Sequence, residues 1–182
     1  MGFATGSAMN EKADRQMSMR RWLLPVLLGL AALVWLTGQG LPAVVASHFA
    51  AGGMADGYMP RTPYLLLMLA LVLGLPAIMA FVPLLDAEGP AKGLNLPNRD
   101  YWLDPARRGQ TIRILNGFMA RFACALAVLL AYTHLLVVRA NQVVPPHLAE
   151  RAMITGLVLF VVVMLFLSWR LVRYFRRVPG RR

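Results

Sequence analysis

The sequence contains few of the residues on which catalytic and metal sites depend. Its 182 residues include one cysteine, three histidines and eight Asp or Glu side chains. The single cysteine, Cys124, lies in an apolar run and has no second cysteine for an intramolecular disulfide, so it says nothing about the redox compartment. The sequence shows no Ser/His/Asp or Cys/His pattern, no compact metal-ligand spacing and no glycine-rich phosphate loop. We therefore expect neither an enzyme nor a resident cofactor.

Negative charge is also scarce, and the charge balance argues against two further classes of protein. Nineteen Lys and Arg residues give a formal net charge of +11. In a soluble protein this excess would indicate nucleic acid, but a 58% hydrophobic content and a mean hydropathy of +0.57 are too apolar for a soluble domain. The positive residues follow the ends of apolar runs, which indicates anionic lipid headgroups instead. No acidic residue lies in the middle of an apolar run, which argues against an ion or proton transporter.

Four apolar runs are long enough to cross a bilayer, which takes about 20 helical residues. We expect transmembrane helices at about 22–46, 63–85, 112–138 and 152–173. The first should be interrupted between Gly38 and Pro42, and the second should bend at Gly74 and Pro76. The predicted fold is all-α, a four-transmembrane-helix bundle over residues 21–173. A disordered tail at 1–20 and a basic tail at 174–182 flank it.

Positive charge is concentrated on one side of this predicted bundle. Fifteen Lys and Arg residues lie in the two tails and in the connection between the second and third helices. The opposite side has only Arg61, Arg139 and Arg151. The positive-inside rule therefore places both termini and the central connection in the cytoplasm. The loops near residues 47–62 and 139–151 then face outward.

The segment 41–61, L-P-A-V-V-A-S-H-F-A-A-G-G-M-A-D-G-Y-M-P-R, interrupts the helical pattern. Pro42, Pro60 and three glycines exclude a single straight helix here. The glycines permit positive φ, so the chain can reverse and bring Asp56 back toward His48. Such a contact would favour the protonated imidazole and make the loop responsive to pH near neutrality. The alternative is a capping or re-entrant loop whose polar groups only satisfy the backbone.

The three histidines are weak candidates for a metal site. His48 and His147 fall in the two outer loops, and His134 lies about one turn below the outer end of the third helix. With Asp56 and Glu150 they could supply nitrogen and oxygen ligands. The simpler interpretation is that His134 makes a hydrogen bond between helices while the other two are solvated. A histidine within the membrane is still a functional candidate.

A second polar motif, G-L-N-L-P-N-R-D-Y-W-L-D-P-A-R-R, occupies residues 93–108. Asp104 followed by Pro105 predicts an N-cap and first residue of a helix that continues into the third span. Tyr101 and Trp102 suit the lipid headgroup region. The segment is either an interfacial anchor and helix start or a docking surface for a cytoplasmic partner. Its candidate residues are Asn95, Pro97, Asn98, Arg99, Tyr101, Trp102, Arg107 and Arg108.

The two motifs together carry a family resemblance. The 41–61 segment resembles the L-P-x-x-V/I-x-x-H-F-x-x-x-G-x-x-D-G signature of the bacterial membrane domain-of-unknown-function family 1648. That domain also occurs in SdpI-like immunity proteins. The later N-L-P-N-R-D-Y-W-L-D-P-A-R-R is similar to a motif that follows the domain, so the resemblance covers roughly residues 23–115. The matching positions in the first signature are Pro42, His48, Phe49, Gly53, Asp56 and Gly57.

The resemblance implies a function in sensing or immunity. SdpI-like proteins are polytopic, confer immunity to a secreted toxic peptide and signal by holding a transcriptional repressor at the membrane. This chain, with four predicted spans and a basic tail, is shorter than they are. By the resemblance we expect a multi-pass protein of the bacterial cytoplasmic membrane.

Three functional classes stay open at this stage. The first is a binding, signalling or immunity protein that senses an extracytoplasmic ligand through the 41–61 loop. The second is a structural or accessory subunit of a larger membrane complex, since small residues in the spans allow close helix approach. A transporter or an enzyme is the third and has the least support. The expected partners are the bilayer with its anionic headgroups and a partner protein or second copy of the chain, with no nucleic acid.

Overall fold

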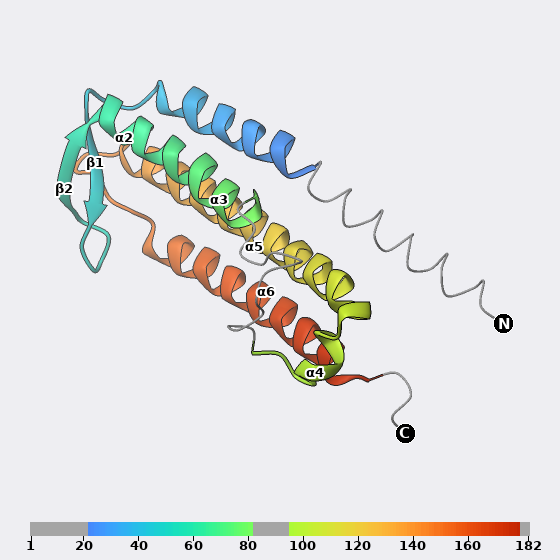
Figure 1. Ribbon diagram of the computed structural model, residues 1–182. Helices are drawn as coiled ribbons and strands as arrows, with labels where there is room; N and C mark the ends of the chain where they lie inside the picture. The colour runs from blue at the N-terminus through green and yellow to red at the C-terminus, as the bar shows by residue number, and fades with distance from the viewer. Residues whose placement is uncertain (1–21, 82–94, 179–182) are drawn as a thin grey trace.

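The computed structural model describes residues 22–81 and 95–178 of the chain (Figure 1). Of these residues 73% are helical. Within the described ranges, three helices are long and apolar enough to cross a membrane, namely Arg61–Ala80, α5 (Pro105–Ala140) and α6 (Glu150–Arg176). The prediction of a mostly helical membrane protein is confirmed.

The first helix ends earlier than the sequence pattern predicts. It covers Trp22–Gly38 instead of residues 22–46, and the predicted interruption before Pro42 is its actual end. The apolar residues that follow belong to a strand, because Val44 and Val45 are β-branched and Pro42 cannot donate a helical hydrogen bond. The predicted disordered tail at 1–20 lies outside the described residues.

The second helix is built from α2 (Arg61–Leu69), η1 (Ala70–Gly74) and α3 (Leu75–Phe81). The middle segment η1 is a single π-helical turn. Pro76 lies two residues beyond its end, and a proline removes one N–H donor and crowds the carbonyl four residues earlier. A widened turn relieves both problems, and it lies where the sequence predicts a bend. The helix begins two residues before the predicted 63–85 range, and residues 82–85 lie outside the described part.

Both long helices of the C-terminal half extend beyond their predicted ranges, 112–138 and 152–173. The Asp104 side chain caps α5 by accepting a hydrogen bond from the backbone nitrogen of Ala106 at 2.9 Å, with Pro105 as the first helical residue. The predicted helix start at Asp104–Pro105 is confirmed. α6 continues to Arg176, so the predicted boundary at 173/174 falls inside a helix.

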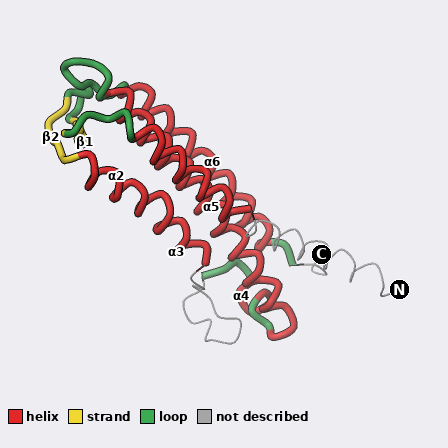
Figure 2. The backbone as a smooth tube through the Cα atoms, turned by 90° about the horizontal axis from the view of Figure 1, so that it is seen from above, coloured by secondary structure: helices red, strands yellow, loops and turns green. Residues whose placement is uncertain are grey.

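The helices run alongside one another (Figures 1 and 2). One core cluster joins the first helix to α2 and α5 through Val34, Tyr64 and Val137. A second cluster joins Leu27 of the first helix to α3 and to Ala123 of α5. α6 packs on α5, and no residue in the most apolar 18-residue stretch of α6 is buried. The bundle therefore has a closed core on one side and an exposed apolar helix on the other.

A two-stranded antiparallel hairpin, β1 (Val44–Phe49) and β2 (Ala55–Pro60), stands at one end of the bundle. The short helix α4 (Arg99–Trp102) and the end of α6 lie at the opposite end (Figure 1). We refer to these as the hairpin end and the α4 end. The all-α prediction did not include the hairpin, which replaces the expected irregular loop.

Candidate functional site

The hairpin brings His48 and Asp56 together, as the glycine spacing predicts. His48 Nδ1 lies 2.5 Å from Asp56 Oδ1. His48 pairs with Gly57 in the strand register, and the register shifts on both sides of His48. Irregularities of this kind re-aim a side chain, and here they direct the imidazole to the residue beside its strand partner. The side chains are 75% and 47% exposed, so a ligand can reach both.

The motif glycines are required by the hairpin itself. A Cβ atom at Gly57 would lie 2.7 Å from the Cβ atom of His48. A Cβ atom at Gly53 would overlap the carbonyl oxygen of Leu148. Gly52 and Gly53 adopt φ angles of +86° and +84°, which side chains with a Cβ atom disfavour. These positions therefore explain part of the motif without any ligand.

Arg61 fastens the base of the hairpin to the end of the first helix. Its guanidinium Nη1 donates to the carbonyl oxygens of Gln39 at 3.2 Å and Leu41 at 3.1 Å. Its backbone nitrogen donates to the carbonyl of Ala43 at 2.9 Å. The chain leaving a helix carries carbonyls without intrahelical donors, and Arg61 supplies donors to it.

Asn141, the C-cap residue of α5, holds β1 from another side. Its Oδ1 accepts from the backbone nitrogen of Ala46 at 2.8 Å, and its Nδ2 donates to the carbonyls of Ala46 at 3.0 Å and Val137 at 2.9 Å. Ala46 is fully buried, so its backbone groups cannot reach water. The Asn141 carboxamide thus forms the two backbone hydrogen bonds with Ala46 that a neighbouring strand would otherwise form.

The loop between α5 and α6 packs against the hairpin. The backbone nitrogen of Leu148 donates to the carbonyl of Gly53 at 2.8 Å, and that of Ala55 donates to the carbonyl of Pro146 at 3.4 Å. Met54 and His147 form an isolated β-bridge. The hairpin and this loop therefore form one unit, which we call the hairpin cap and define as residues 41–60 and 141–149.

The remaining positions of the first motif have different surroundings. Pro42 is exposed between the first helix and β1. Phe49 is partly buried and packs against the clusters that contain Val45 and Leu148. Phe49 therefore anchors the hairpin cap to the bundle, whereas the neighbouring His48 faces outward.

His134 lies inside the bundle with both ring nitrogens engaged. Nε2 is 3.0 Å from the Thr37 hydroxyl, and Nδ1 is 3.0 Å from the Tyr64 hydroxyl. The imidazole also stacks on the Tyr64 ring at 5.7 Å between centroids, and the residue is fully buried. His134 thus joins the first helix, α2 and α5, which is the interhelical hydrogen bond that the simpler interpretation predicts.

The three histidines do not form a shared metal site. His134 is enclosed by hydroxyl groups, His48 pairs with Asp56, and His147 lies beside Gly53. Within residues 22–81 and 95–178, no three His, Cys, Asp or Glu side chains are grouped so that they could hold a metal ion. The geometry does not support the metal site considered for these histidines.

The second motif folds onto the end of α6. Trp102 Nε1 donates to the carbonyl of Phe175 at 2.8 Å. Asn98 Nδ2 donates to the carbonyls of Phe175 and Arg176, each at 3.1 Å. Carbonyls in the last turn of a helix lack intrahelical donors, so these two side chains cap α6. Trp102 is 4% exposed, so its indole is enclosed by protein and does not contact lipid headgroups as the sequence predicts.

Several further contacts surround this indole. Its ring lies against three other aromatic rings, those of Tyr101, Tyr174 and Phe175. The buried hydroxyl of Thr111 donates to the Trp102 carbonyl at 2.7 Å. Arg107 lies over the Tyr101 ring at 4.0 Å and donates to its carbonyl at 3.3 Å. Of the other motif positions, Asn95 and Pro97 precede α4, Arg99 begins it, and Arg108 lies in the first turn of α5.

Sequence reasoning identified the motifs but missed Asn141, Thr111 and Phe175. An asparagine at a helix end is a recognised capping residue, so Asn141 carried a local signal. No signal in the sequence indicates that its side chain bonds to Ala46, which lies 95 residues earlier.

Comparisons with known proteins return no match: no protein-family model, no curated protein and no solved structure is similar to this chain. The resemblance to family 1648 and to SdpI-like proteins stays a prediction.

Proposed function

We propose that this protein is a binding protein of the bacterial cytoplasmic membrane whose hairpin cap senses an extracytoplasmic ligand. In this proposal four helices cross the bilayer and both termini lie in the cytoplasm. The distribution of arginine supports this orientation. Among the described residues, the arginines near the hairpin end are Arg61, Arg139 and Arg151. The arginines of α4, of the first turns of α5 and of the last turns of α6 lie toward the α4 end.

The observation that carries the proposal is the exposed His48–Asp56 pair on a firmly held hairpin. An isolated two-stranded hairpin is marginally stable, so this one depends on Arg61, Asn141 and the loop before α6. A polar contact this exposed adds little to folding stability. The hairpin is thus held in place, yet the His48–Asp56 pair that it presents is not needed for folding. This combination favours a role of the pair in recognition.

An immunity assay tests this function. A strain lacking the gene is complemented with wild type, His48→Ala or Asp56→Asn and exposed to a panel of secreted toxic peptides. We expect wild type to protect against at least one peptide and both variants to lose protection at unchanged membrane levels. Glu150→Gln is the matched control, because Glu150 is an exposed carboxylate at the same end. Undiminished protection by the His48→Ala/Asp56→Asn double variant would remove the proposed role of the pair.

A second candidate function, an accessory subunit or a homo-oligomer, is favoured by α6. The most apolar 18-residue stretch of α6 has no buried residue, and Leu159, Leu165 and Trp169 are each more than half exposed. Lipid or a partner helix can cover this face. Stoichiometric co-purification of one other membrane protein in mild detergent, or a defined oligomer by light scattering, would support this candidate. A monomer that purifies alone would eliminate it.

A further inference from the structure

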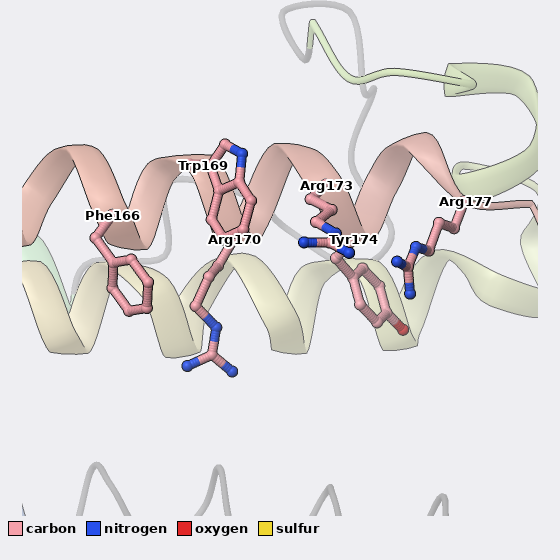
Figure 3. Close-up of a pocket in the computed structure, with 6 residues that line it drawn as sticks. All are labelled: Phe166, Trp169, Arg170, Arg173, Tyr174 and Arg177. Atoms are coloured by element: carbon pink, nitrogen blue, oxygen red, sulfur yellow. The ribbon is translucent and has the colours of Figure 1, made fainter.

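We propose that the last turns of α6 form a binding site for the phosphate group of an anionic phospholipid. A cavity of about 370 Å³ opens there (Figure 3). Its lining residues are Phe166, Trp169, Arg170, Arg173 and Tyr174 of α6, and Arg177, the residue that directly follows the helix. Three guanidinium groups and three aromatic rings thus share one small region.

The spacing along α6 places the arginines close together. Arg170 and Arg173 are three residues apart on α6 and are therefore neighbours on one side of the helix. Arg177 follows just beyond the last helical residue (Figure 3). Aromatic rings hold two of them, because Arg170 lies 5.8 Å from the Phe166 ring centroid and Arg173 lies 5.1 Å from that of Trp169. A guanidinium group held over a ring keeps its N–H donors free for a phosphate, which it binds through two parallel hydrogen bonds.

These charges have no carboxylate partner among the residues that the structure describes. Arginines near a helix C-terminus often bond to the last carbonyls of their own helix. Here the carbonyl of Phe175 already accepts from Trp102 and Asn98. The arginines are therefore not needed as caps, and their mutual repulsion favours an anion between them.

The site lies where α6 leaves the hydrocarbon core. Its 27 residues span about 40 Å, whereas the core is about 30 Å thick, so the last turns reach the headgroups. Phe166 and Trp169 are each 53% exposed and suit the interface, where aromatic rings contact upper acyl chains. The arginines beyond them then lie at the level of the lipid phosphates. This arrangement selects a phospholipid over a small dissolved anion.

Tyr174 connects the cavity to the rest of the α4 end. Its hydroxyl accepts a hydrogen bond from Gln110 Nε2 at 3.0 Å, which leaves the hydroxyl proton available to a phosphate oxygen. Its ring lies 5.2 Å from that of Trp102. This wall of the site is therefore fixed by α5 and by the residue that caps α6.

Native mass spectrometry of the full chain in detergent tests the site. Phosphatidylglycerol and phosphatidylcholine are titrated separately, and bound lipid is counted for wild type and for Arg170→Gln/Arg173→Gln. We expect wild type to prefer phosphatidylglycerol, and the double variant to lose affinity for it by about fivefold per arginine, or about 25-fold. Arg176→Gln is the control, because Arg176 is exposed on the same helix and does not line the cavity. It should bind within about twofold of wild type.

Two results would overturn the proposal. One is an equal loss of affinity in Arg176→Gln, which would mean that total charge alone attracts lipid. The other is displacement of the lipid by millimolar inorganic phosphate, with Trp169→Ala binding as wild type, which would make this a site for free anions. Resistance to inorganic phosphate, together with weaker lipid binding by Trp169→Ala, supports the lipid site. Glutamine is a good helix former, and circular dichroism should show unchanged helicity in the double variant.

Discussion

Replacing Asn141 with alanine should release β1 from the end of α5. The substitution removes two hydrogen bonds to Ala46, at 2.8 and 3.0 Å, and leaves a buried N–H and a buried carbonyl without these partners. Each such group costs about 1–3 kcal/mol. The third bond of the side chain contributes less, because the Val137 carbonyl still accepts from the backbone nitrogen of residue 141. We expect docking of the hairpin cap to weaken by about 2–6 kcal/mol, the sum for the two groups.

Amide hydrogen exchange at Ala46 measures this effect directly. A loss of about 2 kcal/mol in local opening free energy should speed exchange of that amide about 30-fold. Asn141→Asp retains an acceptor for the Ala46 nitrogen but cannot donate to the Ala46 carbonyl. The exchange rate in this variant should therefore lie between those of wild type and Asn141→Ala. Gln142→Ala changes an exposed neighbour and should leave the rate unchanged. Equal exchange rates in Asn141→Ala and Gln142→Ala would refute the assignment of Asn141 as the anchor of β1.

Three further substitutions test other contacts by thermal unfolding in detergent. Gly52→Ala should lower the melting temperature through positive-φ strain alone, about 1–2 kcal/mol, because nothing lies within 4 Å of the added Cβ atom. Gly53→Ala should lower it further, since its Cβ atom also meets the Leu148 carbonyl, and equal effects would argue against that close approach. Trp102→Phe keeps an aromatic ring but removes the donor to the Phe175 carbonyl. It should destabilise by about 1 kcal/mol, and an unchanged melting temperature would contradict the capping role.

Local signals in the sequence predicted most helices of this fold. Asp104 before Pro105 marked the start of α5, and Pro76 marked the irregular turn in the second helix. The end of the first helix was misplaced because Val44 to Ala46 continue the apolar pattern. Their conformation depends on pairing with β2, and hydropathy carries no information about that pairing.

The candidate site was predictable in one part only. His48 and Asp56 are eight residues apart with glycines between them, so local chain reversal sufficed to predict their contact. Asn141 bonds to a residue 95 positions away, and Trp102 donates to a carbonyl 73 positions away. Such partners are selected by helix packing, which a single sequence does not encode in any short pattern. This is also why Trp102 was assigned to the headgroups.

The central claim is that the hairpin cap faces outward while the α4 end faces the cytoplasm. Cysteine labelling tests it most directly, because Cys124→Ser gives a chain without cysteine. Ala51→Cys places a thiol on the exposed turn of the hairpin, and Ala106→Cys places one at the exposed start of α5. In intact cells a membrane-impermeant maleimide should label Ala51→Cys, and should label Ala106→Cys only after permeabilisation. Labelling of both from outside, or of Ala106→Cys alone, would contradict the account.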